Sequence, residues 1–237
     1  MKKIHIHSET VYIAAVALLS FAVAMISSTG FGVSMIVAPA YILSLKVGWL
    51  SFGQAEYVIQ AGLFAVLCLV MRRFKVVYLC SFATCIIYGA ALDLWRLIPA
   101  FNPEKTAPES MAMWSRILMF AGGMLLTSLA VALFFKTYLY PQVYDFFVKA
   151  VSGKYGIKTP VFKTCFDLVC LACATVMTLV FFGGFKGVSF GTLIMAVANG
   201  TIIGLFTKLI DKYFEITPRF KRAAEWFKLD WFKTAAG

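Results

Sequence analysis

The sequence predicts an all-α membrane protein in which six transmembrane helices form two inverted three-helix repeats, each with a short re-entrant or interfacial helix. Three observations predict this fold class. Of the 237 residues, 61% are hydrophobic and only 14% are charged, whereas a soluble domain is closer to half apolar and a quarter charged. The apolar residues lie in blocks long enough to cross a bilayer as helices. Finally, the order of long blocks and short segments occurs twice along the chain.

Six blocks rich in Leu, Ala, Phe and Val, each about 18 to 22 residues long, account for most of the chain. The predicted spans are 10–29, 54–71, 76–97, 115–135, 162–182 and 188–207. The first block follows Lys2 and Lys3 and is not followed by a small-residue cleavage site. We therefore expect a retained helix rather than a cleaved signal peptide. The alternation typical of outer-membrane barrel strands is absent from the sequence.

The net charge of +11 is explained by membrane topology. With the N-terminus in the cytoplasm, 17 of the 22 Lys and Arg residues fall inside, and the five outside are Lys46, Arg96, Lys105, Arg116 and Lys186. This split follows the positive-inside rule with both termini cytoplasmic. We therefore expect the bilayer, with its anionic lipid, as the partner of the basic residues, and no nucleic acid.

Two pairs of segments indicate an internal repeat. Residues 78–98 resemble 189–210 when Gly89 is aligned with Gly200, and residues 51–64 resemble 158–171. Each unit contains three spans, which is an odd number, so the second copy would be inserted upside down. The predicted organisation is 1–98 as first repeat, 99–114 as outer linker, 115–210 as second repeat and 211–237 as a cytoplasmic amphipathic tail.

Each predicted repeat contains a short segment after its first span. Residues 33–45 form an uncharged apolar run of 13 residues, which is too short to cross the membrane and favours insertion as a re-entrant helix. Gly30, Gly32 and Pro39 provide breaks around it. The second segment, 138–151, carries Asp145 and Lys149, and both insertion and a position flat on the inner surface stay open. An inserted half-helix would direct its unpaired amides into a cavity.

The candidate binding site consists of polar residues in the spans, which are costly in a bilayer and mark function, together with Ser34 and Asp145 from the two short segments. The predicted solute-binding residues are Glu56, Gln60, Asp167, Asn199, Ser34, Tyr57 and Asp145. Asp167 is the strongest candidate, because no basic residue follows it until Lys186. A protonatable carboxylate at that depth could bind a cation or couple transport to protons. The alternative is a neutral Asp167 bonded to a neighbouring helix. Asp93 and Arg96, three residues apart, are expected to pair with each other.

The sequence offers no catalytic, cofactor or metal site of a known kind, so we expect no enzyme activity. All six cysteines lie in predicted spans, which argues against a disulfide framework. Cys170 and Cys173 form a C-x-x-C sequence, but small apolar cysteines also allow close helix packing. The only histidines, His5 and His7, lie in the N-terminal tail.

Three stretches carry a family resemblance: GFGVS from Gly30, SFGQAEYVIQ from Ser51, and FKGVSFGTLIMAVANGTIIGLFTKLI from Phe185. They resemble the bacterial YczE/YitT-like multi-pass membrane proteins of the DUF6198 kind, over most of residues 15–210. The resemblance implies a fold and a location in the bacterial plasma membrane rather than an activity. The family often reads Gly-Val-Ser-Pro in the first unit. Here Met35 follows Ser34 and the proline is Pro39, which leaves the register of the first short helix open.

These features together predict a transporter of a small solute, proton- or cation-coupled, with its binding site between the repeats. Two other classes fit the same sequence. The chain could be a substrate-binding or accessory subunit that works with a partner membrane protein, or it could be a channel. Small-residue helix faces are compatible with a partner or a homodimer. Flux through liposomes that contain this chain alone separates these classes.

Overall fold

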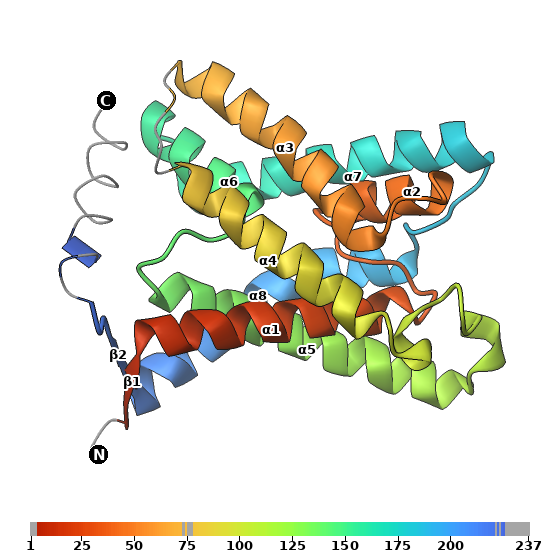
Figure 1. Cartoon of the computed structure of the whole chain (residues 1–237), viewed down its shortest axis with the longest axis horizontal. Helices are drawn as coiled ribbons and strands as arrows, with labels where there is room; N and C mark the ends of the chain where they lie inside the picture. The colour runs from red at the N-terminus through yellow and green to blue at the C-terminus, as the bar shows by residue number, and fades with distance from the viewer. Residues whose placement is uncertain (1–3, 73, 75–77, 221, 223, 226–237) are drawn as a thin grey trace.

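The computed structural model describes residues 4–72, 74, 78–220, 222 and 224–225. Within these residues it is almost entirely helical, so the all-α prediction is confirmed (Figure 1). The helices are α1 (Ser8–Ser27), α2 (Ala38–Lys46), α3 (Phe52–Met71), α4 (Leu79–Trp95), α5 (Met113–Lys136), α6 (Val143–Tyr155), α7 (Thr159–Phe182) and α8 (Phe190–Tyr213). Two 3-10 turns, η2 (Pro99–Phe101) and η3 (Pro108–Ser110), join α4 to α5, and two short strands are β1 (Ile4–His7) and β2 (Phe214–Thr217).

Five of the helices, α1, α3, α5, α7 and α8, are long and apolar enough to cross a bilayer. The chain is therefore a multi-pass membrane protein. The predicted span 76–97 corresponds to α4, which has only 17 residues, and residues 75–77 lie outside the described part of the chain. A sixth crossing thus stays a prediction. The last predicted span, 188–207, was too short, because α8 continues to Tyr213.

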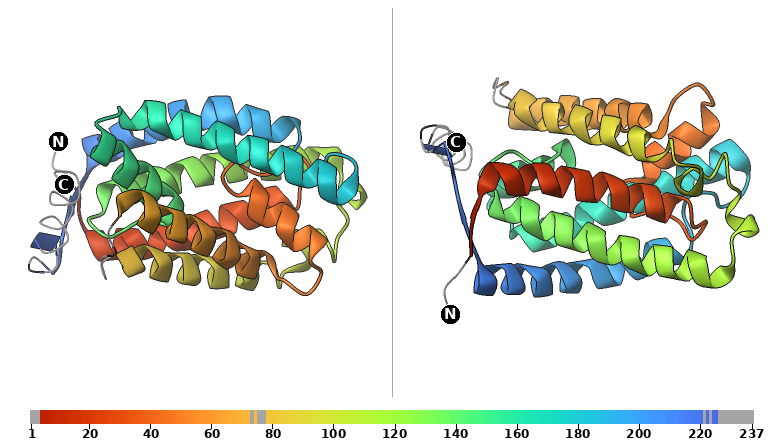
Figure 2. Two further views of the ribbon diagram at one scale, coloured as in Figure 1. Left: turned by 90° about the horizontal axis from the view of Figure 1, so that it is seen from above. Right: turned by 60° about the horizontal axis from the view of Figure 1, so that its bottom comes forward.

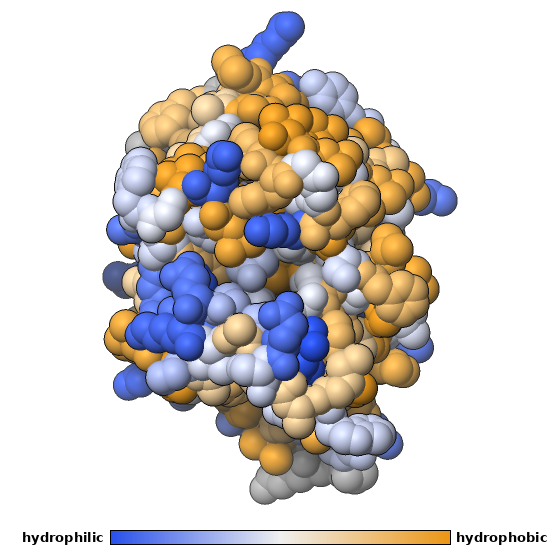
Figure 3. All heavy atoms as spheres, turned by 90° about the vertical axis from the view of Figure 1, so that its right-hand side faces the viewer, coloured by the Kyte–Doolittle hydropathy of each residue, from blue (hydrophilic) through white to orange (hydrophobic). Residues whose placement is uncertain are grey.

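The long helices run between two ends of the molecule, and Figure 2 shows them side by side in two further views. One end, here called the strand end, carries β1, β2 and the connections from α5 to α6 and from α6 to α7 (Figure 1). The other, the loop end, carries residues 28–37, η2, η3 and the turn between α7 and α8. The five basic residues that the sequence places outside all belong to the loop end. Figure 3 looks on to this end and shows hydrophilic residues among hydrophobic ones.

Helix packing links the two halves of the chain. Helix α1 packs against α4 and α5, and α5 also packs against α8. Each short helix contacts helices of both halves, and α6 also makes a smaller contact with α4. Helix α2 packs on α3 and α7, and α6 packs on α7 and α3. The two short helices therefore connect the halves.

Both short helices are packed inside the fold and begin later than predicted. Six of the nine residues of α2 and eight of the thirteen residues of α6 are buried. The expected helix 33–45 begins at Ala38, because residues 34–37 form a turn in which the Ser34 carbonyl accepts bonds from the amides of Val37 and Ala38. Pro39 lies in the first turn of α2, where proline is well tolerated.

The expected helix 138–151 is also displaced. It begins after Pro141, at Val143, and ends at Tyr155. The alternative that it lies flat on the surface is not supported, since Phe146 is fully buried and α6 packs between α3 and α7.

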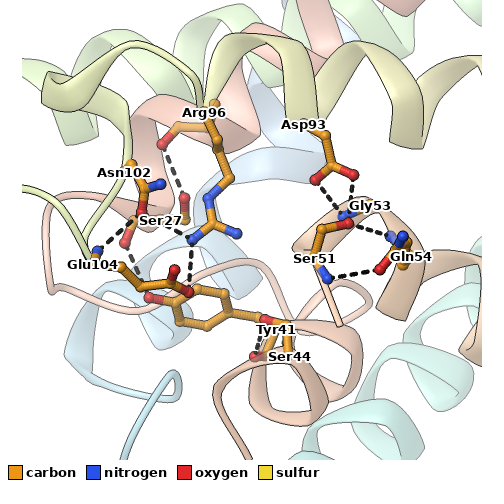
Figure 4. Close-up of polar contacts among 11 residues, drawn as sticks. Ser27, Tyr41, Ser44, Ser51, Gly53, Gln54, Asp93, Arg96, Asn102 and Glu104 are labelled. Carbon is orange, nitrogen blue, oxygen red and sulfur yellow. Dashed lines mark hydrogen bonds and ion pairs between the residues drawn. The ribbon is translucent and has the colours of Figure 1, made fainter. Parts of the chain in front are cut away.

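The start of α3 is fixed by polar contacts at the loop end (Figure 4). The Ser51 hydroxyl accepts a bond from the Gln54 amide at 3.0 Å, and the Gln54 side chain accepts one from the Ser51 amide at 3.0 Å. The Asp93 carboxylate accepts bonds from the Ser51 hydroxyl and from the Gly53 amide. Free amides and a positive dipole at a helix start favour a carboxylate there. Asp93 thereby joins the end of α4 to the start of α3.

This arrangement corrects the expected pairing of Asp93 with Arg96. Arg96 lies one turn away and contacts the linker instead, with a guanidinium nitrogen 3.6 Å from Glu104 Oε1 and 3.4 Å from Asn102 Oδ1. The guanidinium also stacks over the Phe52 ring. The Ser51 hydroxyl and the Gly53 amide both donate to Asp93, so the helix start satisfies this carboxylate without Arg96.

A contact that the sequence did not predict joins the two ends of the chain. Strand β1 pairs in parallel with β2, from Ile4 opposite Phe214 to His7 opposite Thr217. The Glu9 carboxylate accepts bonds from the amides of Arg219 and Phe220. The predicted tail 211–237 therefore begins as the last turn of α8 and strand β2. An amphipathic helix was expected over 217–234, and residues 221, 223 and 226–234 of that stretch lie outside the described residues.

Candidate functional site

A cavity of about 290 Å³ lies at the centre of the molecule. Residues 34–37, just before α2, form one part of its wall, and the start of α6 forms another. The remaining wall comes from α1, α4, α5, α7 and α8. Apolar lining residues include Leu19, Val23, Met195 and Ile203. The cavity is therefore built from both halves of the chain and combines apolar surface with a few polar groups, as small-molecule sites do.

Both short helices begin at the cavity. Residues 34–37 lead directly into α2, and Gln142, Tyr144 and Asp145 belong to the first turn of α6 or precede it. The first amides of a helix have no partner within the helix, and they form the positive end of its dipole. Some of these amides are already paired, since Ala38 donates to the Ser34 carbonyl and Val143 donates to Gln60 Oε1. What the two helix starts, one from each half, contribute to the same cavity is the positive end of a helix dipole.

Among the described residues, three cavity side chains, those of Gln142, Thr127 and Asp167, carry a buried polar atom without a hydrogen-bond partner. Gln142 is 6% exposed and Thr127 is 7% exposed. The atoms are the side-chain amide nitrogen of Gln142, the hydroxyl of Thr127 and Oδ1 of Asp167. Buried polar atoms are almost always paired, so each exception needs an explanation. Their position on the cavity wall indicates groups that a bound molecule can use.

A cluster of three charges lies where α6 meets α7. Lys163 Nζ is 3.6 Å from Asp145 Oδ1 and 3.8 Å from Asp167 Oδ1. All three residues line the cavity and are partly buried. Asp145 and Asp167 were predicted site residues, whereas Lys163 was missed. Its spacing of four residues before Asp167 on one helix was the signal that could have found it.

The predicted residues Ser34 and Asn199 also line the cavity. Asn199 Oδ1 accepts a hydrogen bond from the Ser128 hydroxyl at 3.1 Å, which joins α5 to α8 beside the cavity. Ser34 lies in the turn before α2. The wall of this cavity thus brings together four predicted residues from segments far apart in the sequence. They are Ser34, Asp145, Asp167 and Asn199.

Glu56 and Gln60 lie behind the wall rather than on it. Both are fully buried. Gln60 Nε2 donates to Glu56 Oε2 at 3.0 Å and to Gln142 Oε1 at 3.1 Å. The Tyr144 hydroxyl donates to the same Glu56 oxygen at 3.1 Å. The network links α3 to the start of α6, and it reaches the cavity through Gln142 and Tyr144, two residues that the sequence analysis missed.

Tyr57 lies away from this site, contrary to expectation. Its hydroxyl donates to the carbonyl of Ile86 at 2.9 Å, and its ring packs where Gly89 has no side chain. Tyr57 therefore fills the contact between α3 and α4. It follows Glu56 directly in the helix, so the two side chains point in different directions.

Close backbone packing lies between the cavity and the loop end. The Val33 amide donates to the Gly187 carbonyl at 3.2 Å. An added Cβ would lie 2.5 Å from Thr192 Oγ1 at Gly32, 2.5 Å from the Phe31 carbonyl oxygen at Gly191, and 2.9 Å from the Tyr41 ring at Gly187. We call these three glycines, Gly32, Gly187 and Gly191, the glycine seal. They allow residues 28–37 and α2 to pack tightly against the turn between α7 and α8.

Comparison with known proteins gives one match. Residues 6–208 match the model of a family described as a family of unknown function, DUF6198. This range covers the cavity, both short helices and all the long helices apart from the last turns of α8. No curated protein and no solved structure matches the chain.

Proposed function

The chain belongs to the DUF6198 family, and we propose that it is a membrane transporter whose small solute binds in the central cavity. The observation that carries this proposal is the group of buried polar atoms without a hydrogen-bond partner, those of Gln142, Thr127 and Asp167, on the wall of a cavity built from both halves. Unpaired buried polar atoms are costly. A bound solute that pairs with them recovers part of that cost, which favours binding at this place.

The order of the helices supports two inverted repeats. A long helix, a short helix and two more long helices occur in α1 to α4 and again in α5 to α8. The short helix of each half packs on the third element of the other half, α2 on α7 and α6 on α3. Reciprocal packing of this kind is expected for two related units around a shared axis. Inverted repeats place the solute at the interface between the two units.

The carboxyl groups near the cavity supply a means of coupling. Asp167 reaches the cavity directly, and Glu56 reaches it through Tyr144 and Gln142. Intramembrane carboxyl groups commonly relay protons or bind cations. We propose that Asp167 carries the coupling charge and that Glu56 transmits its state between α3 and α6.

The glycine seal favours alternating access over a channel. A channel needs a continuous aqueous path, whereas the segments on the loop-end side of the cavity pack backbone against backbone. The proposal is therefore that this packing separates and re-forms during transport. An accessory subunit that captures solute for a partner membrane protein is the second candidate, because it would use the same cavity.

Reconstitution of this chain alone in liposomes tests the proposal. We expect a pH gradient to drive uptake from a mixture of small metabolites, measured by mass spectrometry together with an internal pH dye. Asp167→Asn should lower the proton-linked uptake by roughly tenfold or more, as for loss of a group essential to coupling. The matched control is Asp211→Asn on α8, where an exposed carboxylate pairs with Lys136 outside the cavity.

Two results would contradict the proposal. The first is that the protein alone gives no flux and that a co-purifying membrane protein restores the flux. This result would favour the accessory subunit. Unchanged pH-dependent uptake in Asp167→Asn would exclude this carboxylate from coupling.

A further inference from the structure

The two halves differ in how their last two helices meet. Helices α3 and α4 pack closely, and a Cβ added at Gly53 would lie 2.2 Å from the Gly89 carbonyl oxygen. Helix α7 makes its main contacts with α2 and α6, and α8 makes its main contacts with α5 (Figure 1). On α8, Gly200 and Gly204 have no atom within 4 Å of an added Cβ. The α7–α8 pair corresponds to the α3–α4 pair of the first half, and its two helices are therefore separated where α3 and α4 are in close contact.

The cavity reaches the surface at this opening. Thr164 on α7, and Ala196 and Gly200 on α8, line the cavity and are exposed. Around them the surface is apolar, with Leu168 56% exposed and Val197 83% exposed. These residues lie inside two helices that are long and apolar enough to cross the membrane. The opening therefore faces the hydrocarbon of the bilayer rather than water.

We propose that the cavity has a lateral portal to the bilayer between α7 and α8, through which it takes up an amphipathic cation. This inference rests on the proposed function and specifies the class of solute. The portal is the space bounded by Thr164, Ala196 and Gly200. An apolar body can enter from lipid through it, while the tight packing at the loop end is kept.

The chemistry of the cavity selects the charge of the solute. Asp145 and Asp167 face one ammonium group, that of Lys163, which leaves one formal negative charge in excess. The Thr127 hydroxyl and Asp167 Oδ1, which have no hydrogen-bond partner among the described residues, can accept bonds from an ammonium head. The free Gln142 Nε2 is a donor and suits an acceptor atom elsewhere on the solute. Leu19, Val23 and Met195 offer apolar contacts for the body. A protonated amine with a short alkyl chain fits this set, whereas a carboxylate would be repelled by the excess charge.

Photolabelling of the full chain in phosphatidylcholine vesicles tests the portal. The probes are two short alkyl chains that carry the same diazirine, one ending in a primary amine and the other in a carboxylic acid. We expect the amine to label the buried cavity residue Met195 and its neighbours, located by mass spectrometry. Labelling by the amine should exceed labelling by the acid by roughly tenfold, as one charge contact in a poorly solvated site allows.

A bulky residue in the portal provides a matched comparison. Gly200→Trp should reduce amine labelling of Met195 by roughly tenfold, since the new ring occupies the entrance. The control is Gly62→Trp on α3, which also has no atom within 4 Å of an added Cβ but does not line the cavity. Both substitutions point into open space, so both variants are expected to fold.

Labelling confined to lipid-facing residues such as Val197 and Leu168 would overturn the portal. Equal labelling of Met195 by the acid and the amine would overturn the preference for a cation. Labelling is independent of flux, so the two proposals can fail separately. Amine labelling of the cavity without any transport would leave the portal standing and contradict the transporter. Uptake of water-soluble solutes alone, with no labelling of the cavity, would support the transporter and contradict the portal.

Discussion

At the scale of single residues, the closest helix contacts are made where a side chain is missing. At Gly53 an added Cβ would lie 2.2 Å from the Gly89 carbonyl oxygen and 2.6 Å from an Asp93 carboxylate oxygen. Gly89 in turn faces the Tyr57 ring, at 2.4 Å from an added Cβ. Small residues bring membrane helices into close van der Waals contact, which is a main source of their association. The α3–α4 contact therefore depends on these two positions.

Gly53→Ala is expected to destabilise the protein by about 1–3 kcal/mol, because the new methyl group must displace α4 or break the Asp93 contact. The apparent melting temperature in detergent should fall by roughly 2 to 10 °C for a chain of this size. Size-exclusion chromatography after heating measures it. Gly62→Ala on the same helix is the control, because nothing lies within 4 Å of its added Cβ. Equal melting temperatures for the two variants would show that the contact does not require glycine.

The candidate site was only partly predictable at this scale. Asp167 and Asn199 could be found because a polar residue in an apolar span is unusual, and Asp145 because it lies in a predicted short helix. Lys163 could have been found from its spacing to Asp167. Gln142 and Tyr144 carry no such signal, because they lie next to Pro141 at the start of α6 and outside the long spans. Their importance arises only where α6 meets α3, at Glu56 and Gln60. This contact between α6 and α3 is tertiary, so the hydrophobic periodicity of the local sequence does not indicate it.

At the scale of elements, the short helices show what breaking residues can and cannot predict. Glycine and proline correctly indicated that residues 30–52 are not a simple span. The boundaries were wrong because Pro39 lies in the first turn of α2 instead of ending a helix. Gly32 was expected to break a helix. It takes a positive φ of 91° in the chain before α2, and it also permits contact with the turn between α7 and α8.

The glycine seal should be sensitive to one methyl group. In Gly191→Ala the added Cβ would meet the Phe31 carbonyl oxygen at 2.5 Å and the Phe120 ring at 2.7 Å. We expect the first turn of α8 to separate from residues 28–37, at a cost of about 1–3 kcal/mol to the closed packing. Deuterium exchange of peptides that contain residues 30–37 and 187–192 should then increase.

The control for this change is Gly200→Ala on the same helix, where the added Cβ meets nothing within 4 Å. It should leave exchange at the loop end unchanged. Exchange that is equal in the two variants would mean that the seal tolerates side chains and does not act as a gate.

At the scale of the whole molecule, some features of the arrangement could be predicted from the sequence and others could not. Apolar block length predicted five of the long helices, and the five Lys and Arg residues that the sequence places outside all belong to the loop end. The pairing of β1 with β2 could not be predicted. It joins two four-residue strands about 200 positions apart, and such short segments show no distinctive pattern. The asymmetry between α3–α4 and α7–α8 is equally absent from the sequence, because it is a property of one conformation.

If the halves are inverted repeats, this asymmetry should reverse during transport. The α7–α8 pair would close as α3–α4 now does, and α3–α4 would open. Spin labels on exposed positions test this, with Val176 and Val197 reporting on α7–α8 and Val58 and Ile87 on α3–α4. The labels are placed in a background without the six native cysteines. In vesicles, Gly191→Ala should favour the alternative state, since it weakens the closed loop end.

We therefore expect a second, shorter distance population for the α7–α8 pair and a second, longer one for the α3–α4 pair, both increased by Gly191→Ala. Electron–electron double resonance measures the two distributions. Gly62→Ala serves as the control and should leave both unchanged. A change in only one pair would mean that the halves do not exchange conformations, because alternating access of two related units couples closure of one pair to opening of the other. Distributions that are single and identical in all variants would contradict the exchange altogether.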